Sequence, residues 1–244
     1  MKKYPFLSIF LILIFFVLLS LSVIWQRSEK EEMETGQKIE EKKNLIPETS
    51  VQEKKAQFKS TIVPAVNKVY TDLMQRYQEV LELTQIAGNS EQLSALRQEY
   101  KATDNDELLM ALKPHPQSIA LAQAAMESSW ATSRFFREAN NVFGIWSFRE
   151  NEPRIPAGKT RADKVIWLKK YSSVEASIRD YYRTLARGDA YSEFRILKME
   201  TNDPYALIQK LDRYSEKGAE YGEELSAIIR FNNFVAYDQQ QLKL

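Results

Sequence analysis

The N-terminal segment places the strongest constraint on what this chain can fold into. From Tyr4 to Trp25 the chain has no charged residue and consists mostly of Leu, Ile, Phe and Val. A helix needs roughly 20 apolar residues to cross about 30 Å of hydrocarbon, whereas the apolar part of a signal peptide usually has about 7–15. We therefore expect residues 1–27 to form an N-terminal membrane anchor, with residues 4–25 inside the cytoplasmic membrane.

Two properties of this anchor stay open at the level of sequence. Ser20 and Ser22 are small residues of the kind that precedes a cleavage site, so removal of the segment is an alternative. Basic residues both precede and follow the apolar run, and their number does not favour an external C-terminus. Because long domains translocate largely regardless of flanking charge, the orientation has to be argued from the rest of the chain.

Composition narrows the remaining possibilities. Residues 28–57 are dominated by Glu, Lys and Gln, so they cannot bury enough apolar surface to offset their ordering entropy and we expect a charged tether. Over the whole chain, 34 basic residues nearly balance 33 acidic ones, which argues against a nucleic-acid partner. The chain has no cysteine, which excludes disulfides and thiolate metal sites.

The sequence contains one histidine, His115, which lies between two prolines. A single histidine is too few for a multi-histidine metal site. Its position between chain-breaking residues predicts an exposed loop side chain.

Helical periodicity begins after the tether. The apolar spacing over residues 66–81 predicts a helix that Gly88 closes, and Asn89 and Asp104 are the predicted N-caps of two more. Residues 58–113 therefore read as a helical N-terminal extension packed on the following domain.

The second half of the chain predicts more helices and one strand pair. An alanine-rich helix is expected over residues 117–129, followed by a loop at Asn140, Asn141 and Gly144. Residues 143–171 contain prolines and one strand-like run, which predicts a small irregular hairpin. Ser172 with Glu175, and Asp203 with Pro204, mark further helix starts. The predicted class is mainly α (α+β), with one small β-hairpin.

Several motifs of this half resemble a known family. The chain reads Ala-Ala-Met-Glu-Ser-Ser-Trp-Ala-Thr-Ser-Arg-Phe over residues 124–135 and Asn-Asn-Val-Phe-Gly-Ile-Trp over residues 140–146, and residues 214–221 read Tyr-Ser-Glu-Lys-Gly-Ala-Glu-Tyr. Together they resemble the family 73 glucosaminidases, and most closely the Bax-like proteins of Gram-negative bacteria. The resemblance covers about residues 58–238. It implies a lysozyme-like helical domain over residues 114–244, no cofactor, and cleavage of peptidoglycan glycan strands.

The residues themselves support Glu127 as a general acid. It lies in the last turn of an apolar helix, where desolvation and the negative helix end both raise a carboxyl pKa. A carboxyl that stays protonated near neutral pH suits proton donation to a glycosidic oxygen. The alternative is a helix-end glutamate that forms a salt bridge with Arg134 or Arg137.

The second carboxylate is less well defined. Many family members carry Thr-x-Glu in the first hairpin strand, and this sequence has none there. Glu152 is the first choice, with Glu150 and Asp163 as alternatives, although each alone also fits a solvated surface charge. Carboxyl groups about 5–5.5 Å apart would indicate a covalent nucleophile and about 6.5–9.5 Å an inverting base. A third route uses the N-acetyl group of the substrate.

The resemblance also implies further site residues. Tyr214 matches a tyrosine that assists at the reaction centre, with a core tyrosine as the alternative. Phe143, Gly144 and Trp146 are expected to line the sugar groove, although Trp146 also fits the core. Where the family often has glycines this chain has Ser129 and Ala131, both small enough to keep close packing.

Other functions remain possible from sequence alone. The missing Thr-x-Glu favours a non-catalytic wall-binding module, and the charged tether would suit a membrane-tethered adaptor. A peptidoglycan amidase is the enzymatic alternative, although it commonly needs zinc. The wall substrate leads us to expect a single-pass membrane protein with its catalytic domain in the periplasm or outside the cell. The oligomeric state stays open.

Overall fold

The computed structural model describes residues 50–87, 90–161 and 164–239. The chain divides into two compact units, residues 1–50 and 51–244, and the described helices and strands belong to the second. The predicted anchor and Asp163 lie outside the described residues, as does most of the predicted tether. Among the residues that are described, no helix has both the length and the apolar character needed to cross a membrane.

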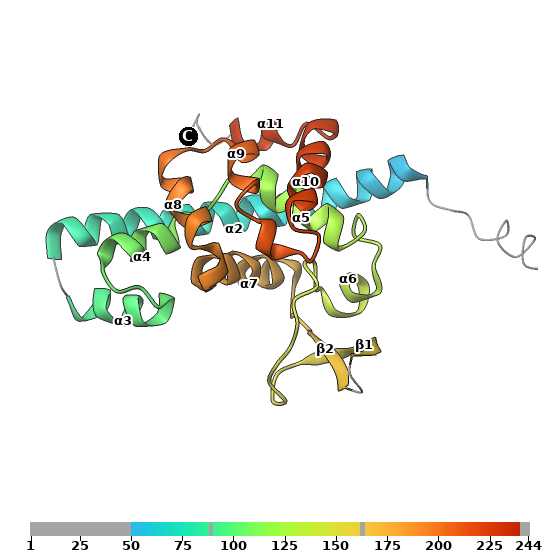
Figure 1. Cartoon of the computed structure of the whole chain (residues 1–244), viewed down its shortest axis with the longest axis horizontal. Coiled ribbons are helices and arrows are strands. Elements are labelled where there is room, and N and C mark those ends of the chain that lie inside the picture. Colours follow the sequence, from blue (N-terminus) through green and yellow to red (C-terminus); the bar gives the residue numbers. More distant parts are fainter. Residues whose placement is uncertain (1–49, 88–89, 162–163, 240–244) are drawn as a thin grey trace, which may run out of the picture. The chain divides into compact units, whose positions relative to one another are not determined.

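The described unit is mainly helical, with one two-stranded antiparallel sheet (Figure 1). This confirms the predicted helical class and the single hairpin. Its elements are α2 (Val51–Ala87), α3 (Glu91–Tyr100), α4 (Asn105–Leu112), α5 (Gln117–Glu127), α6 (Arg134–Ala139), β1 (Arg154–Arg161), β2 (Lys164–Lys169), α7 (Val174–Arg187), η1 (Asp189–Tyr191), α8 (Ser192–Glu200), α9 (Pro204–Ile208), η2 (Asp212–Tyr214), α10 (Ala219–Phe231) and α11 (Val235–Gln239).

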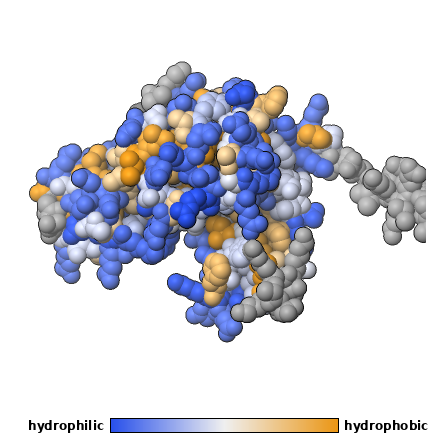
Figure 2. Space-filling model, in the orientation of Figure 1, coloured by the Kyte–Doolittle hydropathy of each residue, from blue (hydrophilic) through white to orange (hydrophobic). Residues whose placement is uncertain are grey.

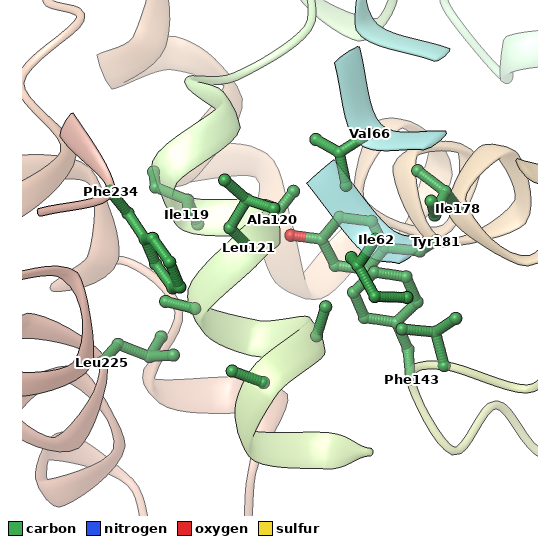
Figure 3. Packing of buried hydrophobic residues seen from close by; sticks show 14 of the residues in the cluster. Ile62, Val66, Ile119, Ala120, Leu121, Phe143, Ile178, Tyr181, Leu225 and Phe234 are labelled. Carbon is green, nitrogen blue, oxygen red and sulfur yellow. The ribbon is translucent and has the colours of Figure 1, made fainter. Parts of the chain in front are cut away.

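Helix α5 lies at the centre of the core. Residues 117–125 are all buried, and the alanines at positions 120, 122, 124 and 125 are fully enclosed. Because alanine side chains are short, α2 and α10 can both pack against this helix, and α9 and α11 contact it as well. Figure 3 shows buried side chains of α2, α7 and α10 converging around it. The predicted alanine-rich helix is confirmed, and it ends at Glu127.

Helix α2 begins earlier than the composition predicts. It starts at Val51, inside the segment predicted as a tether, and Phe58 and Ile62 are fully buried. Phe58 packs edge-on against Trp130 with ring centroids 5.1 Å apart and stacks on Phe234 at 6.3 Å. These contacts fix the first turns of α2 to the rest of the core.

The predicted N-cap positions of the later helices are correct to within one residue. Asp104 caps α4 as expected, since its side chain accepts from the backbone N–H of Glu107 at 2.8 Å. Ser90, and not Asn89, caps α3, and Ser173, and not Ser172, caps α7. In both cases the serine has extended backbone angles and accepts from an N–H three residues later, which is the geometry of an N-cap. The short helices α6 and α8 were not predicted.

The hairpin is irregular, as expected. Strands β1 and β2 pair antiparallel, with a bulge between Pro156 and Thr160. Pro156 has no N–H to donate, which suits a bulge. An isolated bridge between Trp146 and Leu168 ties the preceding loop to β2. The face of the molecule in Figure 2 is mainly hydrophilic, with smaller hydrophobic areas between the charged side chains.

Candidate active site

An unusual turn follows Glu127 at the end of α5. Ser129, Trp130 and Ala131 have φ angles of 51°, 61° and 62°, in the left-handed region that favours glycine. The hydroxyl of Ser128 accepts from the backbone N–H of Ala131 at 2.7 Å and stabilises the turn. Small size was the property expected to matter at Ser129 and Ala131. The structure shows instead that these two residues have positive φ angles, and glycine adopts such angles with less strain than serine or alanine.

The environment of Glu127 raises its proton affinity. Its carboxyl is partly buried, and the Tyr221 hydroxyl donates to Glu127 Oε1 at 3.0 Å. Burial raises the pKa of Glu127, and the Tyr221 hydrogen bond and the charge of Lys217 offset part of that rise. Arg134, which sequence offered as a salt-bridge partner, pairs with Glu138 at 3.0 Å. The salt-bridge alternative with Arg134 is therefore not what the structure shows.

A row of buried side chains leads from Glu127 into the core. Gln123 Nε2 donates to the Tyr221 hydroxyl at 2.9 Å, and the Tyr181 hydroxyl donates to Gln123 Oε1. Tyr181 Oη in turn lies 3.1 Å from His115 Nε2. We call His115, Tyr181, Gln123, Tyr221 and Glu127 the His115–Glu127 row. Figure 3 shows the Tyr181 oxygen directed toward α5.

The prediction that His115 is an exposed loop residue was wrong. The side chain is 1 % exposed, and its ring stacks on Tyr182 with centroids 4.5 Å apart. Its Nδ1 lies 3.0 Å from the carbonyl oxygen of Pro116. Burial and the nearby charge of Lys198 lower the pKa of His115 to about 3, so the ring is neutral at physiological pH.

Tyr214 lies beside the row in η2. Its ring stacks on that of Tyr221, with centroids 5.6 Å apart and planes 15° apart. Burial, and then the charge of Glu127, raise the pKa of Tyr214 well above its usual value, so the phenol keeps its proton. The side chain is only partly buried and lines the same cleft as Glu127.

The loop after α6 is shaped by its two asparagines, as the sequence predicts. Asn140 has a φ of 51° and donates to the carbonyl of Tyr171 at 3.0 Å. Asn141 donates to the carbonyls of Ile145 and Lys169 and accepts from the N–H of Ile145 at 2.9 Å. Gly144 has a φ of 64°, which an L side chain rarely adopts. The loop is thereby tied to β2 and turns into the cleft.

The cleft in front of Glu127 has a volume of about 960 Å³. Its aromatic lining comprises Phe143, Trp146, Phe148, Tyr191 and Tyr214, and its charged lining comprises Glu127, Glu152, Asp180, Lys101, Arg149, Lys169, Arg183 and Arg187. Groups from α5, the Asn140–Gly144 loop, the hairpin region and α7 meet here. The first-choice site residues from the sequence all line this cleft, namely Glu127, Phe143, Gly144, Trp146, Glu152 and Tyr214.

The predicted sugar-binding residues differ in exposure. Trp146 is 42 % exposed and lies near the exposed ring of Phe148, so it is not a core residue. Phe143 is 4 % exposed and stacks on Tyr181 with centroids 3.9 Å apart. Trp146 therefore offers an open aromatic face to a ligand, whereas Phe143 mainly supports the cleft wall.

Of the three candidates for a second carboxylate, Glu152 lines the cleft. The Ser147 hydroxyl donates to Glu152 Oε1 at 2.6 Å, and this bond is the main reason why the pKa of Glu152 is lowered. Glu150 is exposed and does not line the cleft. Asp163 lies outside the described residues.

Sequence reasoning missed several polar residues at this site. Asp180 lines the cleft and accepts from Lys169 Nζ at 2.8 Å and from the Tyr171 hydroxyl at 2.7 Å. Neither Gln123 nor Tyr221 was given a role at the site. Gln123 lies inside the alanine-rich stretch and Tyr221 ends the 214–221 motif, so both were detectable signals. No group of three or more His, Cys, Asp or Glu side chains that suits a metal ion occurs within the described ranges.

Two curated proteins are similar to this chain. The protein called Protein bax from Escherichia coli (strain K12) is 32% identical over 123 residues, which is 48% of this chain and 43% of that protein. Exo-glucosaminidase LytG from Bacillus subtilis (strain 168) is 24% identical over 131 residues, covering 50% of this chain and 46% of that protein. The matched region thus spans less than half the length of either relative.

Solved structures show a weaker likeness. The catalytic domain of the autolysin Auto from Listeria monocytogenes is 19% identical with a TM-score of 0.47, covering 83% of this chain and 97% of that one. A peptidoglycan hydrolase from Sphingomonas sp. A1 is 21% identical with a TM-score of 0.42, covering 52% of this chain and 86% of that one.

The sequence pattern of one family matches this chain over residues 107–234, which is more than half of its length and includes Glu127, Glu152 and Tyr214. That family is described as mannosyl-glycoprotein endo-beta-N-acetylglucosaminidase. The match covers α5, the hairpin and the helices up to α10. The chain belongs to this glucosaminidase family.

Proposed function

We propose that this protein is an endo-acting glycoside hydrolase that cleaves the N-acetylglucosamine linkages of peptidoglycan, with Glu127 as the general acid. Family membership supports glycoside hydrolysis. Ligand sites typically have volumes of about 300–1,000 Å³. The cleft, at about 960 Å³, lies at the upper end of this range, so the cleft has room for more than one sugar ring.

The observation that carries this proposal is the opposite behaviour of two carboxyl groups in one cleft. The pKa of Glu127 is raised by burial, whereas that of Glu152 is lowered by the Ser147 hydroxyl. Two carboxyls whose environments separate their pKa values suit an acid and a base of one reaction. Glu127 donates its proton to the glycosidic oxygen, and the leaving sugar departs as the bond breaks.

The positive charge that develops on the cleaved sugar needs a partner. Ionised Glu152 can act there as nucleophile or as base for a water molecule, and the N-acetyl group of the substrate is the alternative. Tyr214, a neutral phenol next to Glu127, supports the charge that develops at the sugar ring. Trp146 stacks on an apolar sugar face.

Charge at the cleft supports peptidoglycan as the polymer. Peptidoglycan carries carboxylates on its peptide stems, and on its lactyl groups where a stem has been removed. Lys169 and Arg183 pair with Asp180 and Glu99, but Lys101, Arg149 and Arg187 have no ion-pair partner within the described part of the chain. A cleft with surplus cations attracts an anionic polymer. The proposed substrate lies outside the cytoplasmic membrane, which agrees with the proposed single-pass anchor through residues 4–25.

A zymogram with embedded peptidoglycan tests the proposal. We expect the full chain to clear the gel and Glu127→Gln, which keeps the shape but cannot donate a proton, to leave it opaque. Glu220→Gln, which removes an exposed carboxyl at the start of α10, is the matched control and should clear like the parent. Clearing by Glu127→Gln would contradict the assignment, and clearing by neither the parent nor the control would favour a wall-binding module.

A further inference from the structure

The His115–Glu127 row extends from the cleft to a side chain that no ligand in the cleft can contact. His115, Gln123 and Tyr181 are buried in the core, and Tyr221 is 1 % exposed. The five side chains come from α5, α7, α10 and the loop before α5. Buried polar groups are costly unless each is hydrogen-bonded, so such a row has to satisfy its donors and acceptors internally.

The row has more hydrogen-bond contacts than its neutral side chains have hydrogens to supply. The row makes five contacts, which are Pro116 O to His115, His115 to Tyr181, Tyr181 to Gln123, Gln123 to Tyr221, and Tyr221 to Glu127. Each contact needs one hydrogen between its two heavy atoms. Neutral His115, the two tyrosines and one face of the glutamine amide supply one hydrogen each. Four hydrogens serve five contacts unless Glu127 supplies the fifth.

We propose that the His115–Glu127 row holds the proton on Glu127, and that His115 fixes the direction in which the row donates. The inference rests on the proposed role of Glu127 as acid and assigns His115, Tyr181 and Gln123 as positioning residues for it.

The direction follows from the fixed end of the row. The carbonyl of Pro116 can only accept, so Nδ1 of neutral His115 carries the hydrogen and Nε2 accepts from Tyr181. Tyr181 then accepts from the amide nitrogen of Gln123, and the Gln123 oxygen accepts from Tyr221. Tyr221 is left as an acceptor toward Glu127, which bonds to it only as a carboxylic acid.

Ionisation of Glu127 reverses the row. Tyr221 then donates to the carboxylate, and Gln123 has Nε2 toward Tyr221 and Oε1 toward Tyr181, which is the orientation that the structure shows. In that orientation Tyr181 donates to Gln123, so one contact of neutral His115 has no hydrogen. A half-turn of the Gln123 amide therefore accompanies proton transfer to the substrate, and the buried mismatch favours return of the proton to Glu127.

Charged and titratable side chains face both ends of the row. Tyr181, Tyr182 and Lys198 face His115, and the charge of Lys198 opposes a second proton on the ring. Glu127 faces the Tyr214 and Tyr221 phenols and the charge of Lys217, which favours the carboxylate. With Tyr221 as the acceptor, the row works with burial to keep the acid form of Glu127, whereas Lys217, and Tyr221 when it donates, favour the carboxylate.

Two variants interrupt the row at different points. Tyr181→Phe removes one hydroxyl and keeps the ring, and Gln123→Met removes the amide with little change in length. In both, Tyr221 is free to donate to the carboxylate, so we expect the pKa of Glu127 to fall by roughly 1 unit, about the worth of one hydrogen bond.

Tyr182→Phe is the matched control. Tyr182 adjoins Tyr181, is also buried and stacks on the His115 ring, but its hydroxyl has no hydrogen-bond partner among the described residues. Its removal should leave the titration of Glu127 where it is in the parent. If lost packing alone caused the effect, Tyr181→Phe and Tyr182→Phe would change the pKa of Glu127 to a similar extent.

Nuclear magnetic resonance of the full chain tests both ends of the row. Because His115 is the only histidine in the sequence, its ring nitrogens give unambiguous signals, and we expect a neutral ring with hydrogen on Nδ1 at a pH below the pKa of Glu127. The carboxyl carbon of Glu127, assigned by its loss in Glu127→Gln, should titrate lower in Tyr181→Phe and Gln123→Met than in the parent and Tyr182→Phe.

Hydrogen on Nε2 of His115 while Glu127 is protonated, or an unchanged titration in both row variants, would overturn the inference. Neither readout depends on activity. If Glu127→Gln still cleaves the polymer while both readouts behave as expected, the proposed function fails and the row stands.

Discussion

At the scale of single residues, Glu127 combines opposing influences on one proton. Burial raises its pKa, whereas the Tyr221 hydroxyl and Lys217 lower it. It also precedes three consecutive left-handed residues, 129–131, whose conformation turns the chain away from α5 immediately after the carboxyl. Backbone strain of this kind is common at functional sites. The proposed acid is thus held by an enclosed helix on one side and a strained turn on the other.

The strain at Ala131 predicts a stabilising substitution. Its φ of 62° costs an alanine roughly 1 kcal/mol relative to glycine. We expect Ala131→Gly to raise the free energy of unfolding by up to about 1 kcal/mol, with the greater flexibility of unfolded glycine offsetting part of the gain. Denaturant unfolding measures it. A loss of stability of similar size would show that the methyl group of Ala131 contributes packing that outweighs the strain.

The lowered pKa of Glu152 predicts the acidic limb of the pH profile. In the proposed mechanism Glu152 acts when ionised and Glu127 when protonated, so activity should fall below the pKa of Glu152 and above that of Glu127. Glu152→Gln should lower kcat at least about 100-fold, the usual worth of a general base, and flatten the acidic limb. Rates of polymer cleavage against pH measure this. Full activity in Glu152→Gln would point to the substrate's N-acetyl group instead.

At the scale of elements, α5 is the part that sequence predicts best. Its alanine stripe and its position after a proline follow from local pattern, and its observed end at Glu127 lies two residues before the predicted end at residue 129. Caps such as Asp104 and the Asp203–Pro204 start are equally local. The His115–Glu127 row could not be predicted from the sequence, because its hydrogen-bonded members lie up to 98 residues apart, as Gln123 and Tyr221 do. Burial of His115 depends on such distant contacts, so its flanking prolines misled the prediction.

The early start of α2 was missed for a related reason. The charged residues around it suggest a tether, and only the contacts of Phe58 with Trp130 and Phe234 show that this turn belongs to the core. We expect Phe58→Ala to lower the free energy of unfolding by about 3–5 kcal/mol. Val51→Ala, at a site that is 68 % exposed, should change it by less than about 0.5 kcal/mol.

Thermal or denaturant unfolding of the full chain distinguishes the two substitutions. A small effect of Phe58→Ala, equal to that of Val51→Ala, would mean that the start of α2 does not contribute to the core.

At the scale of the whole molecule, the cleft joins parts that lie far apart in the chain. Lys101 follows α3, Arg149 and Glu152 precede β1, and Tyr214 lies in η2. Motif resemblance placed the acid, the loop and the tyrosine motif at one site, and the structure brings them to one surface. The cationic lining could not be predicted, because the chain is nearly neutral overall and only folding gathers these side chains.

This charge predicts a preference for polymer that carries peptide stems. Replacing both Lys101 and Arg149 by Gln removes two exposed cations from the cleft without touching Glu127. We expect KM for peptide-bearing glycan to rise several-fold, with little change for uncharged N-acetylglucosamine oligomers, and the difference to shrink at high salt. Steady-state kinetics on the two substrates test this. Equal effects on both would show that the cations do not recognise the stems.

The identity of the bond that is cut tests the central claim most directly. Mass spectrometry of the fragments that the full chain releases from peptidoglycan should show reducing N-acetylglucosamine ends, and Glu127→Gln should release none. Free stem peptides with intact glycan, or the same reducing ends from Glu127→Gln, would contradict glycan cleavage by a proton from Glu127.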